Sequence, residues 1–250
     1  MRNYIIIVFY FVLFACNPSE DPQDEYITLS ENDLSISYND EFQILAVFNR
    51  AGYTTADLIW ESEAENIANV DQNGLVTGKR KGKTTITVRT ADNLFSSSCK
   101  VEVQPINFLF KEPYFDFGQD QAFITNKESR YLSVQIPEAM IFDGENQNIR
   151  YLNYRFKEGK YEYSFVVLPG DQDIQEEVHD FLIQRYDLLG SSSGQIEGLT
   201  SAGDIDPAAS ATYDLGSSTL RLYFENEEVN ITYAIDEYRD IVIFYFPKVN

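Results

Sequence analysis

The sequence predicts a two-domain chain, in which an all-β sandwich is followed by an α+β domain with an antiparallel sheet and one or two helices. Short segments with alternating apolar residues and no helical periodicity fill residues 27–104. An apolar stripe at helical spacing appears in residues 174–189. The chain has 250 residues, of which 44% are hydrophobic and 14% aromatic, and this is enough for two modest cores.

The composition excludes several functional classes. The chain has 19 Lys and Arg against 40 Asp and Glu, a net charge of −21, so it lacks the clustered positive charge that binds nucleic acid. One His and two Cys cannot form a tetrahedral Cys/His zinc site. We therefore expect no nucleic-acid partner, no metal and no cofactor.

The N-terminus has the pattern of an export signal. Arg2 precedes an apolar run from Tyr4 to Ala15, which is shorter than the ~20 residues of a membrane-spanning helix but long enough for a signal peptide. The run ends in Leu13-Phe14-Ala15-Cys16, which resembles the lipobox of bacterial lipoproteins, although Phe14 is bulkier than usual. The resemblance implies a signal peptide over residues 1–15 and acylation of Cys16, for example with palmitate. An ordinary signal peptide with an unrelated cysteine is the alternative.

Residues 16–26 are predicted to form an acidic tether. Pro and acidic residues without apolar ones keep a segment extended. Acids directly behind an acylated Cys16 resemble the export signal of Bacteroidetes surface lipoproteins, which implies an outer-membrane, cell-surface location. Any acidic tether shares this pattern, so an orientation toward the periplasm stays open. Because anionic lipid repels so acidic a chain, the membrane contact would be made by the N-terminal lipid.

The first predicted domain, residues 27–104, has the alternation and turns of a β-sandwich. Asp71-Gln72-Asn73-Gly74 predicts a hairpin, because Asn-Gly tolerates the positive φ of a type I′ turn. A second tight turn lies between Gly78 and Gly82. Its basic residues have two interpretations, contact with an acidic partner or simple solubility; they are Lys79, Arg80, Lys81 and Lys83.

Four motifs follow one another in this domain. They are Trp60-Glu61-Ser62, Ala68-Asn69-Val70-Asp71, Asn73-Gly74-Leu75-Val76-Thr77-Gly78 and Gly82-Lys83-Thr84-Thr85-Ile86-Thr87. In this order they resemble the group 2 bacterial immunoglobulin-like domain, which is seen in intimin and invasin-type surface proteins. Glu61 and Asn39-Asp40 depart from the usual Ser and Gly, but Asn also tolerates positive φ. The resemblance implies an immunoglobulin-like sandwich that serves as a spacer or adhesion unit, without catalytic residues.

Trp60 and Cys99 are predicted to lie in the core of the sandwich. A Trp on the third strand fills the space between the sheets of immunoglobulin-like domains, and ligand stacking is the alternative. With Cys16 acylated, Cys99 has no partner for an intramolecular disulfide. The alternation in residues 99–103 places Cys99 on the core face, and a reactive thiol is the alternative.

The second predicted domain covers residues 106–250. Its helix extends over the stripe from Ile174 to Leu189, with Asp173 and Glu176 as a capping pair and Gly190 at its end. Strands are predicted at residues 161–168, 219–224, 229–235 and 241–246.

Similar segments follow Gly118 and Gly170, and each precedes a hairpin, which predicts two helix–strand–strand repeats. Residues 190–211, rich in Ser, Gly, Ala and Asp, are predicted to form a surface loop over the sheet.

Three patterns in the second domain imitate functional sites. Residues 190–194 match the G-x-S-x-G motif of serine hydrolases but follow a helix instead of a strand, and the single base available is His179. The acids of residues 171–177 lack the spacing of a calcium-binding EF-hand and fit helix capping. Four tyrosines fit strand packing better than a sugar-stacking platform: Tyr151, Tyr154, Tyr161 and Tyr163.

These observations predict a lipid-anchored cell-surface protein with a non-catalytic role in adhesion or ligand binding. The expected ligand is an extracellular glycan or protein. A structural part in an envelope assembly is the alternative. A hydrolase that acts on surface glycans is disfavoured, because the sequence shows no convergent nucleophile, base or metal set. Cys16 is the one site residue that the sequence assigns.

Overall fold

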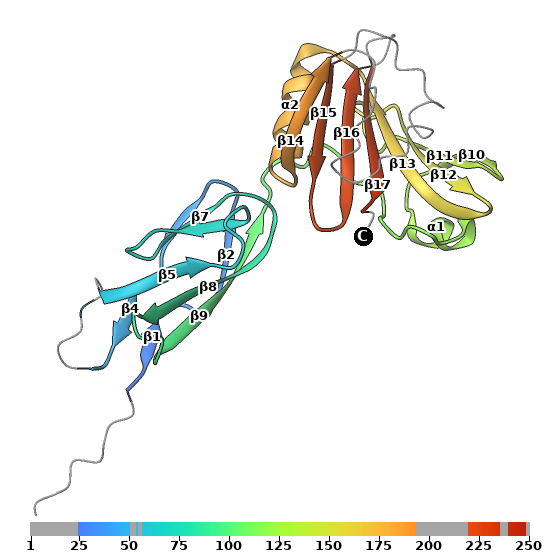
Figure 1. The fold of residues 1–250 in the computed structure, drawn as a ribbon. Helices are drawn as coiled ribbons and strands as arrows, with labels where there is room; N and C mark the ends of the chain where they lie inside the picture. Colours follow the sequence, from blue (N-terminus) through green and yellow to red (C-terminus); the bar gives the residue numbers. More distant parts are fainter. Residues whose placement is uncertain (1–24, 51–53, 55–56, 194–219, 236–239, 249–250) are drawn as a thin grey trace, which may run out of the picture.

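The computed structural model describes residues 25–50, 54, 57–193, 220–235 and 240–248. These residues form two domains that follow one another along the chain (Figure 1). The first is a sandwich of short strands, and the second is built on one large antiparallel sheet with two helices. The predicted fold class is therefore confirmed.

The first domain contains nine strands in three small sheets. The largest sheet has the order β2-β9-β8-β5, in which β2 is parallel to β9, and the others are β3-β7-β6 and β1-β4. The strands are β1 (Ile27–Leu29), β2 (Asp33–Ser37), β3 (Glu41–Gln43), β4 (Ala46–Phe48), β5 (Leu58–Ser62), β6 (Ala68–Val70), β7 (Leu75–Gly78), β8 (Gly82–Thr90) and β9 (Ser96–Gln104).

The core of the first domain holds both residues that the sequence placed there. Trp60 is 4% exposed and packs with the aliphatic residues of both sheets. Cys99 is fully buried, and this burial raises the pKa of its thiol. The core interpretation of both residues is confirmed, because neither ring nor sulfur is accessible to a ligand.

Both predicted turns differ from expectation in detail. β6 and β7 form the predicted hairpin, but only Gly74 has a positive φ, +85°, so the turn is not type I′. Instead Asp71 Oδ1 accepts hydrogen bonds of 2.8 Å from the N–H groups of Asn73 and Leu75, which closes a longer loop. The turn between Gly78 and Gly82 is not a hairpin tip, because β7 and β8 belong to different sheets.

The second domain has one eight-stranded sheet with the order β10-β11-β12-β13-β17-β16-β15-β14, antiparallel throughout. Each helix precedes four consecutive strands, and the two sets meet where β13 pairs with β17. The elements are α1 (Gln121–Lys127), β10 (Leu132–Ile136), β11 (Ala139–Asp143), β12 (Tyr151–Lys157), β13 (Lys160–Leu168), α2 (Gln172–Ile183), β14 (Asp187–Ser193), β15 (Leu220–Glu225), β16 (Val229–Ile235) and β17 (Ile241–Pro247).

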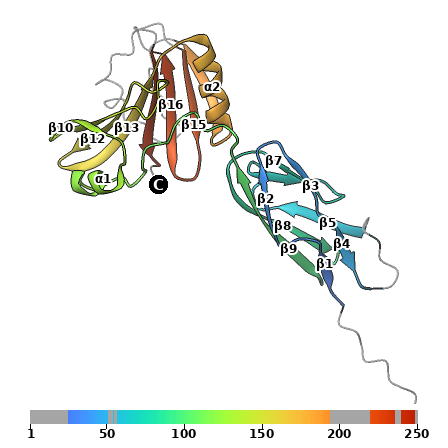
Figure 2. The same ribbon diagram turned by 180° about the vertical axis from the view of Figure 1, so that it is seen from behind.

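Both helices pack on the same face of this sheet (Figures 1 and 2). The main core there combines Ile124 of α1 and Phe181 of α2 with residues of both sets of strands. A smaller apolar cluster occupies the opposite face, because Phe165 and Val167 alternate with the core residue Val166. Its buried members are Tyr163, Phe165, Val167, Ala234, Val242, Phe244 and Phe246.

The repeats are longer than the sequence indicated. We predicted helix–strand–strand units, but each helix precedes four strands. The missed strands include β10 and β14, which form the two edges of the sheet. β10 has one partly buried residue and four exposed ones, so it lacks the apolar alternation that marks a strand.

The predicted helix over residues 174–189 is also too long. α2 ends at Ile183, and Asp187–Ser193 is strand β14. Leu188 and Leu189 therefore do not continue the helical stripe, and both are about half exposed. Residues 190–193 of the predicted loop pair with β15, whereas its remainder from residue 194 lies outside the described residues.

Replacing Gly74 by Ala should lower the free energy of unfolding of the first domain by about 3 kcal/mol. The new Cβ would lie 2.5 Å from Ile44 O and 2.8 Å from Trp60 Cζ2, at a φ that L-residues disfavour. Gly159→Ala in the β12–β13 turn is the matched control, since its φ is +76° but its Cβ meets nothing within 4 Å. Calorimetry, with Trp60 fluorescence to identify the first domain, should show a cost of only about 1 kcal/mol for the control. Equal costs would contradict the packing argument.

Candidate functional site

Most residues that the sequence singled out prove to be structural. Cys16 lies outside the described residues, so its acylation stays a prediction. Tyr154 and Tyr161 belong to the main core, and Tyr163 lies in the cluster on the opposite face. Tyr151 is partly buried against that second cluster. The packing interpretation of the tyrosines is confirmed.

The two motifs around α2 form no catalytic or calcium-binding arrangement in the described residues. Residues 190–193 continue edge strand β14, and His179 is exposed on α2. The N-cap of α2 is Asp171, whose side chain makes no capping hydrogen bond, so the predicted pairing of Asp173 with Glu176 is wrong. Asp173 instead lies in the first turn, where a negative charge favours the helix. The described part of the chain contains no group of three or more His, Cys, Asp or Glu side chains placed to hold a metal ion.

The junction between the domains is the most developed polar site. Arg80, from the β7–β8 turn of the first domain, is 2% exposed. Its Nη2 and Nη1 donate to the two carboxylate oxygens of Glu227 at 2.7 and 3.3 Å. Its Nε lies 3.2 Å from Asp187 Oδ1, and Nη1 also donates to Arg185 O at 3.4 Å. The guanidinium thus meets two carboxylates and one carbonyl of the second domain.

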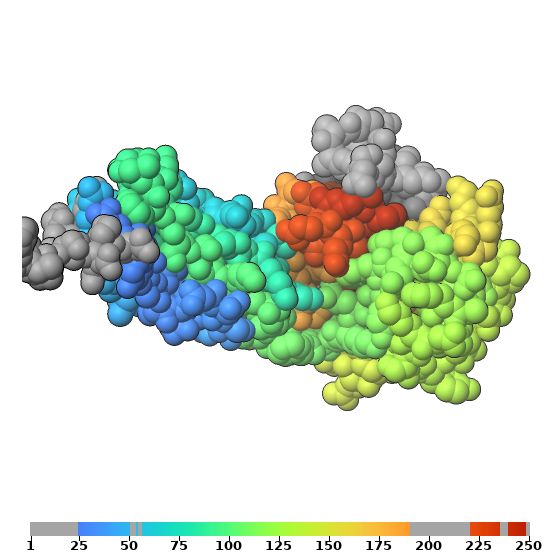
Figure 3. All heavy atoms as spheres, turned by 90° about the horizontal axis from the view of Figure 1, so that it is seen from below, coloured from blue at the N-terminus to red at the C-terminus, as the bar shows by residue number. Residues whose placement is uncertain are grey.

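Further contacts surround this ion pair. Lys81 N donates to Gln184 O at 2.7 Å, and Asn66 Nδ2 donates to Asp187 Oδ2 at 2.8 Å. The buried Gln184 side chain accepts from the backbone N–H groups of Ile106 and Asn107 at 2.8 and 3.0 Å, which holds the linker after β9. The space-filling view shows atoms of the two domains in direct contact (Figure 3).

The acidic partner that the sequence left open is therefore the second domain of the same chain. The solubility interpretation is wrong for Arg80, whereas the side chains of Lys79, Lys81 and Lys83 remain exposed. The hydrogen bonds from Arg80 lower the pKa of Glu227. The sequence did not distinguish Arg80 from the lysines of the same turn, because the partners of Arg80 lie up to 147 positions away along the chain.

Residues 106–117, here called the strap, run from the junction across the helix-bearing face of the sheet. Phe110 stacks on Phe181 with ring centroids 4.4 Å apart. Phe115 stacks on Tyr245 with ring centroids 5.5 Å apart. The strap closes the main core, so its backbone groups require partners within the protein.

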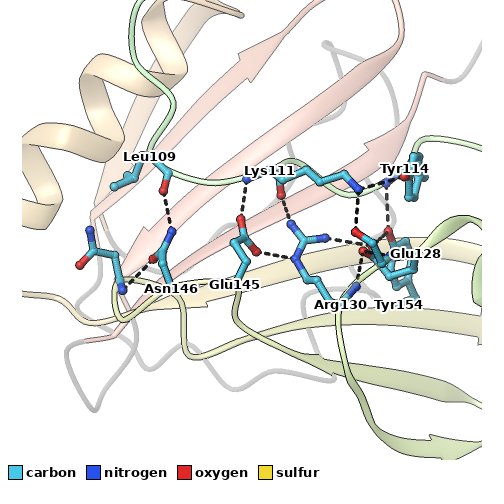
Figure 4. A network of polar contacts seen from close by, with 10 residues as sticks. Leu109, Lys111, Tyr114, Glu128, Arg130, Glu145, Asn146 and Tyr154 are labelled. Atoms are coloured by element: carbon cyan, nitrogen blue, oxygen red, sulfur yellow. Dashed lines mark hydrogen bonds and ion pairs between the residues drawn. The ribbon is translucent and has the colours of Figure 1, made fainter.

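A partly buried polar network provides these partners (Figure 4). Lys111 N donates to Glu145 at 2.6 Å, and Tyr114 N donates to Tyr154 Oη at 3.0 Å. Arg130 pairs with two carboxylates: its Nε lies 2.5 Å from Glu145 Oε2 and its Nη1 lies 2.9 Å from Glu128 Oε2. Its Nη2 donates to the backbone carbonyl of Lys111. Burial alone would raise the pKa of Glu145, but the hydrogen bonds from Arg130 and Lys111 hold it below its ordinary value.

Glu112 connects the strap to the junction. Tyr186 Oη donates to its carboxylate, and Arg185 Nε lies 3.4 Å from Oε2. Lys81 Nζ of the first domain approaches the same oxygen at 4.0 Å. Burial raises the pKa of Glu112 despite these donors and cations. The arrangement stabilises an ion-pair cluster at the interface and presents no free nucleophile.

The first domain is thus an immunoglobulin-like sandwich that contacts the domain after it through the β7–β8 turn and Asn66. Residues 26–101 match the family described as bacterial Ig-like domain (group 2). This confirms the resemblance that the sequence motifs carried.

An uncharacterized protein of Clostridium acetobutylicum is 37% identical over 78 residues, which are 31% of this chain. The match spans only 8% of the length of that protein.

Solved structures show only distant similarity. A mutant intimin from EHEC O157:H7 aligns with 91% of this chain and 91% of its own, at 12% identity and a TM-score of 0.24. SGBP-B of the Bacteroides ovatus mixed-linkage glucan utilization locus, solved with a mixed-linkage heptasaccharide, aligns with 92% of this chain and 63% of its own, at 13% identity and a TM-score of 0.26. Cadherin domains 1–4 of protocadherin gamma B7 align with 90% of this chain and 50% of their own, at 10% identity and a TM-score of 0.28.

Replacing Arg130 by Ala should lower the free energy of unfolding of the second domain by about 3 kcal/mol, because Glu128 would keep a buried charge without its cation. Lys83→Ala is the matched control, since the side chain of Lys83 is 78% exposed and pairs with Glu102 at 3.6 Å. Its cost should stay below about 0.5 kcal/mol. Urea unfolding followed by far-UV circular dichroism measures both, and a loss for Arg130→Ala no larger than that of the control would refute a structural role for the network.

Proposed function

We propose that this protein is a lipid-anchored cell-surface protein with a non-catalytic role in adhesion or ligand binding. The group 2 bacterial immunoglobulin-like domain acts as a stalk, and the second domain acts as the binding module. The observation that carries the proposal is the position of the immunoglobulin-like domain between the lipobox-like Cys16 segment and the second domain.

The structure supports a binding role over a catalytic one by the way its polar groups are used. The acids Glu112, Glu128 and Glu145, of which Glu128 is buried, all pair with basic side chains. The single His of the chain, His179, is exposed on α2. Within the described ranges, the polar chemistry therefore serves to join the strap, the sheet and the first domain.

Attachment to the membrane is assigned to acyl chains on Cys16. No helix in the described part of the chain has the length and apolar character of a membrane span. The net charge of −21 opposes adsorption to anionic lipid, and acyl chains on Cys16 would supply the attachment instead. Residues 16–26 would separate the stalk from the membrane surface and direct the protein to the cell exterior.

Replacing Cys16 by Ser should release the protein from the membrane fraction, because the acyl acceptor is lost. Fractionation of cells with a carbonate wash measures the release, and Cys99→Ala is the matched control because Cys99 is buried in the first domain. The control should remain in the membrane fraction and incorporate labelled palmitate. Membrane retention of the Cys16 variant would refute the lipid anchor, and resistance to protease added to intact cells would refute the surface location.

The mature two-domain chain should bind a glycan or an extracellular protein on arrays of both classes. The Arg130→Ala variant, heated to a temperature at which only its second domain is unfolded, serves as the control and should lose the signal. Signal that survives in this variant would place binding on the first domain. Absence of signal, with co-purification of envelope proteins, would instead support a structural role, and turnover of a glycan would refute the non-catalytic assignment.

A further inference from the structure

We propose that Arg80 is a guanidinium latch that fixes the orientation of the two domains, so that stalk and second domain move as one rigid unit. The inference rests on the junction alone and holds whether or not the protein is lipid-anchored.

The acceptors of Arg80 come from separate parts of the second domain. Arg185 O follows the end of α2, Asp187 begins β14, and Glu227 lies in the β15–β16 turn. The two Nη groups of the planar guanidinium donate in fixed directions to Glu227 and to Arg185 O, and its charge lies 3.2 Å from Asp187 Oδ1 at Nε. A rotation of one domain would break several contacts at once and leave a buried cation unpaired, which is expensive.

The acceptors are held in place by the second domain itself. The side chain of Arg185 is 5% exposed, donates to Phe181 O at 3.0 Å and to Asn107 O, and covers the Phe181 ring at 3.7 Å. The turn that carries Glu227 is closed by Asn226 Oδ1, which accepts from the N–H groups of Glu228 and Val229. The backbone around Arg185 and the turn that carries Glu227 are therefore held by contacts within the second domain.

The turn of the first domain is equally constrained. The N–H groups of Lys79 and Arg80 donate to Ile67 O at 2.8 and 3.2 Å. Gly82, with a φ of +156°, packs so closely that a Cβ would lie 2.9 Å from Ile67 Cδ1. Arg80 therefore extends from a fixed backbone and cannot adjust by moving the turn.

Additional contacts prevent rotation about the guanidinium. Asn66 bonds Asp187 from a different loop of the first domain, and Gln184 holds the linker at Ile106 and Asn107. The contacts of Arg80, of Asn66 and of the linker at Ile106 lie at three separate points, so together they oppose both tilting and twisting of one domain against the other. The latch needs Arg specifically, because the single ammonium of Lys cannot reproduce the separate donations from Nη1 and Nη2 to the two oxygens of Glu227 and to Arg185 O.

Distance measurements between spin labels test the latch in the full chain. Labels at Glu41→Cys in β3 and Glu176→Cys in α2 occupy exposed positions, with Cys16 replaced by Ser and the buried Cys99 retained. The parent should give one narrow distance distribution, and both Arg80→Ala and Arg80→Lys should broaden it. Arg89→Ala is the matched control, because Arg89 makes a similar two-point ion pair with Glu61 inside the first domain. This control should keep the narrow distribution.

A broad distribution in the parent, or a narrow one in both Arg80 variants, would overturn the proposal. Far-UV circular dichroism and Trp60 fluorescence distinguish loosening from unfolding, since Arg80 belongs to neither apolar core. Should Arg80→Ala fail to fold, the pair Asp187→Asn with Glu227→Gln removes the charges of the two carboxylate partners instead. That pair should broaden the distribution as well, and a narrow distribution in it would refute an electrostatic latch.

Discussion

The structure depends on a buried positive charge at the boundary between its domains. Arg80 is almost without solvent contact, and a guanidinium in such a place needs negative partners close by. Those partners, Asp187 and Glu227, belong to the other domain and stay partly hydrated. The pairing therefore stabilises the chain only when the domains are together, and it makes their relative position part of the fold.

The same requirement organises the second domain. Its strap covers the sheet with aromatic side chains, but a backbone segment over a core must satisfy its own polar groups. Glu145, Arg130 and Tyr154 meet this need for Lys111 and Tyr114. Through Glu112, the strap also reaches the junction, where Arg185 and Lys81 approach the same carboxylate. The strap thus carries contacts to two separate ion-pair groups, one at the interface and one in the second domain.

This use of polar groups explains why the sequence pointed to no ligand. The buried charged side chains of the second domain, Glu128, Arg130 and Arg185, are engaged in contacts between segments. The tyrosines that could have formed a stacking surface fill the two apolar clusters of the sheet.

The sequence by itself determined the immunoglobulin-like domain, the burial of Trp60 and Cys99 and the central strands of the second sheet, because these follow from local periodicity and turn residues. It did not reveal edge strands β10 and β14, whose exposed or small residues carry no periodic signal, nor the end of α2. The role of Arg80 was decided by tertiary structure alone. Its partners lie more than a hundred residues away, and only folding brings such distant charges together.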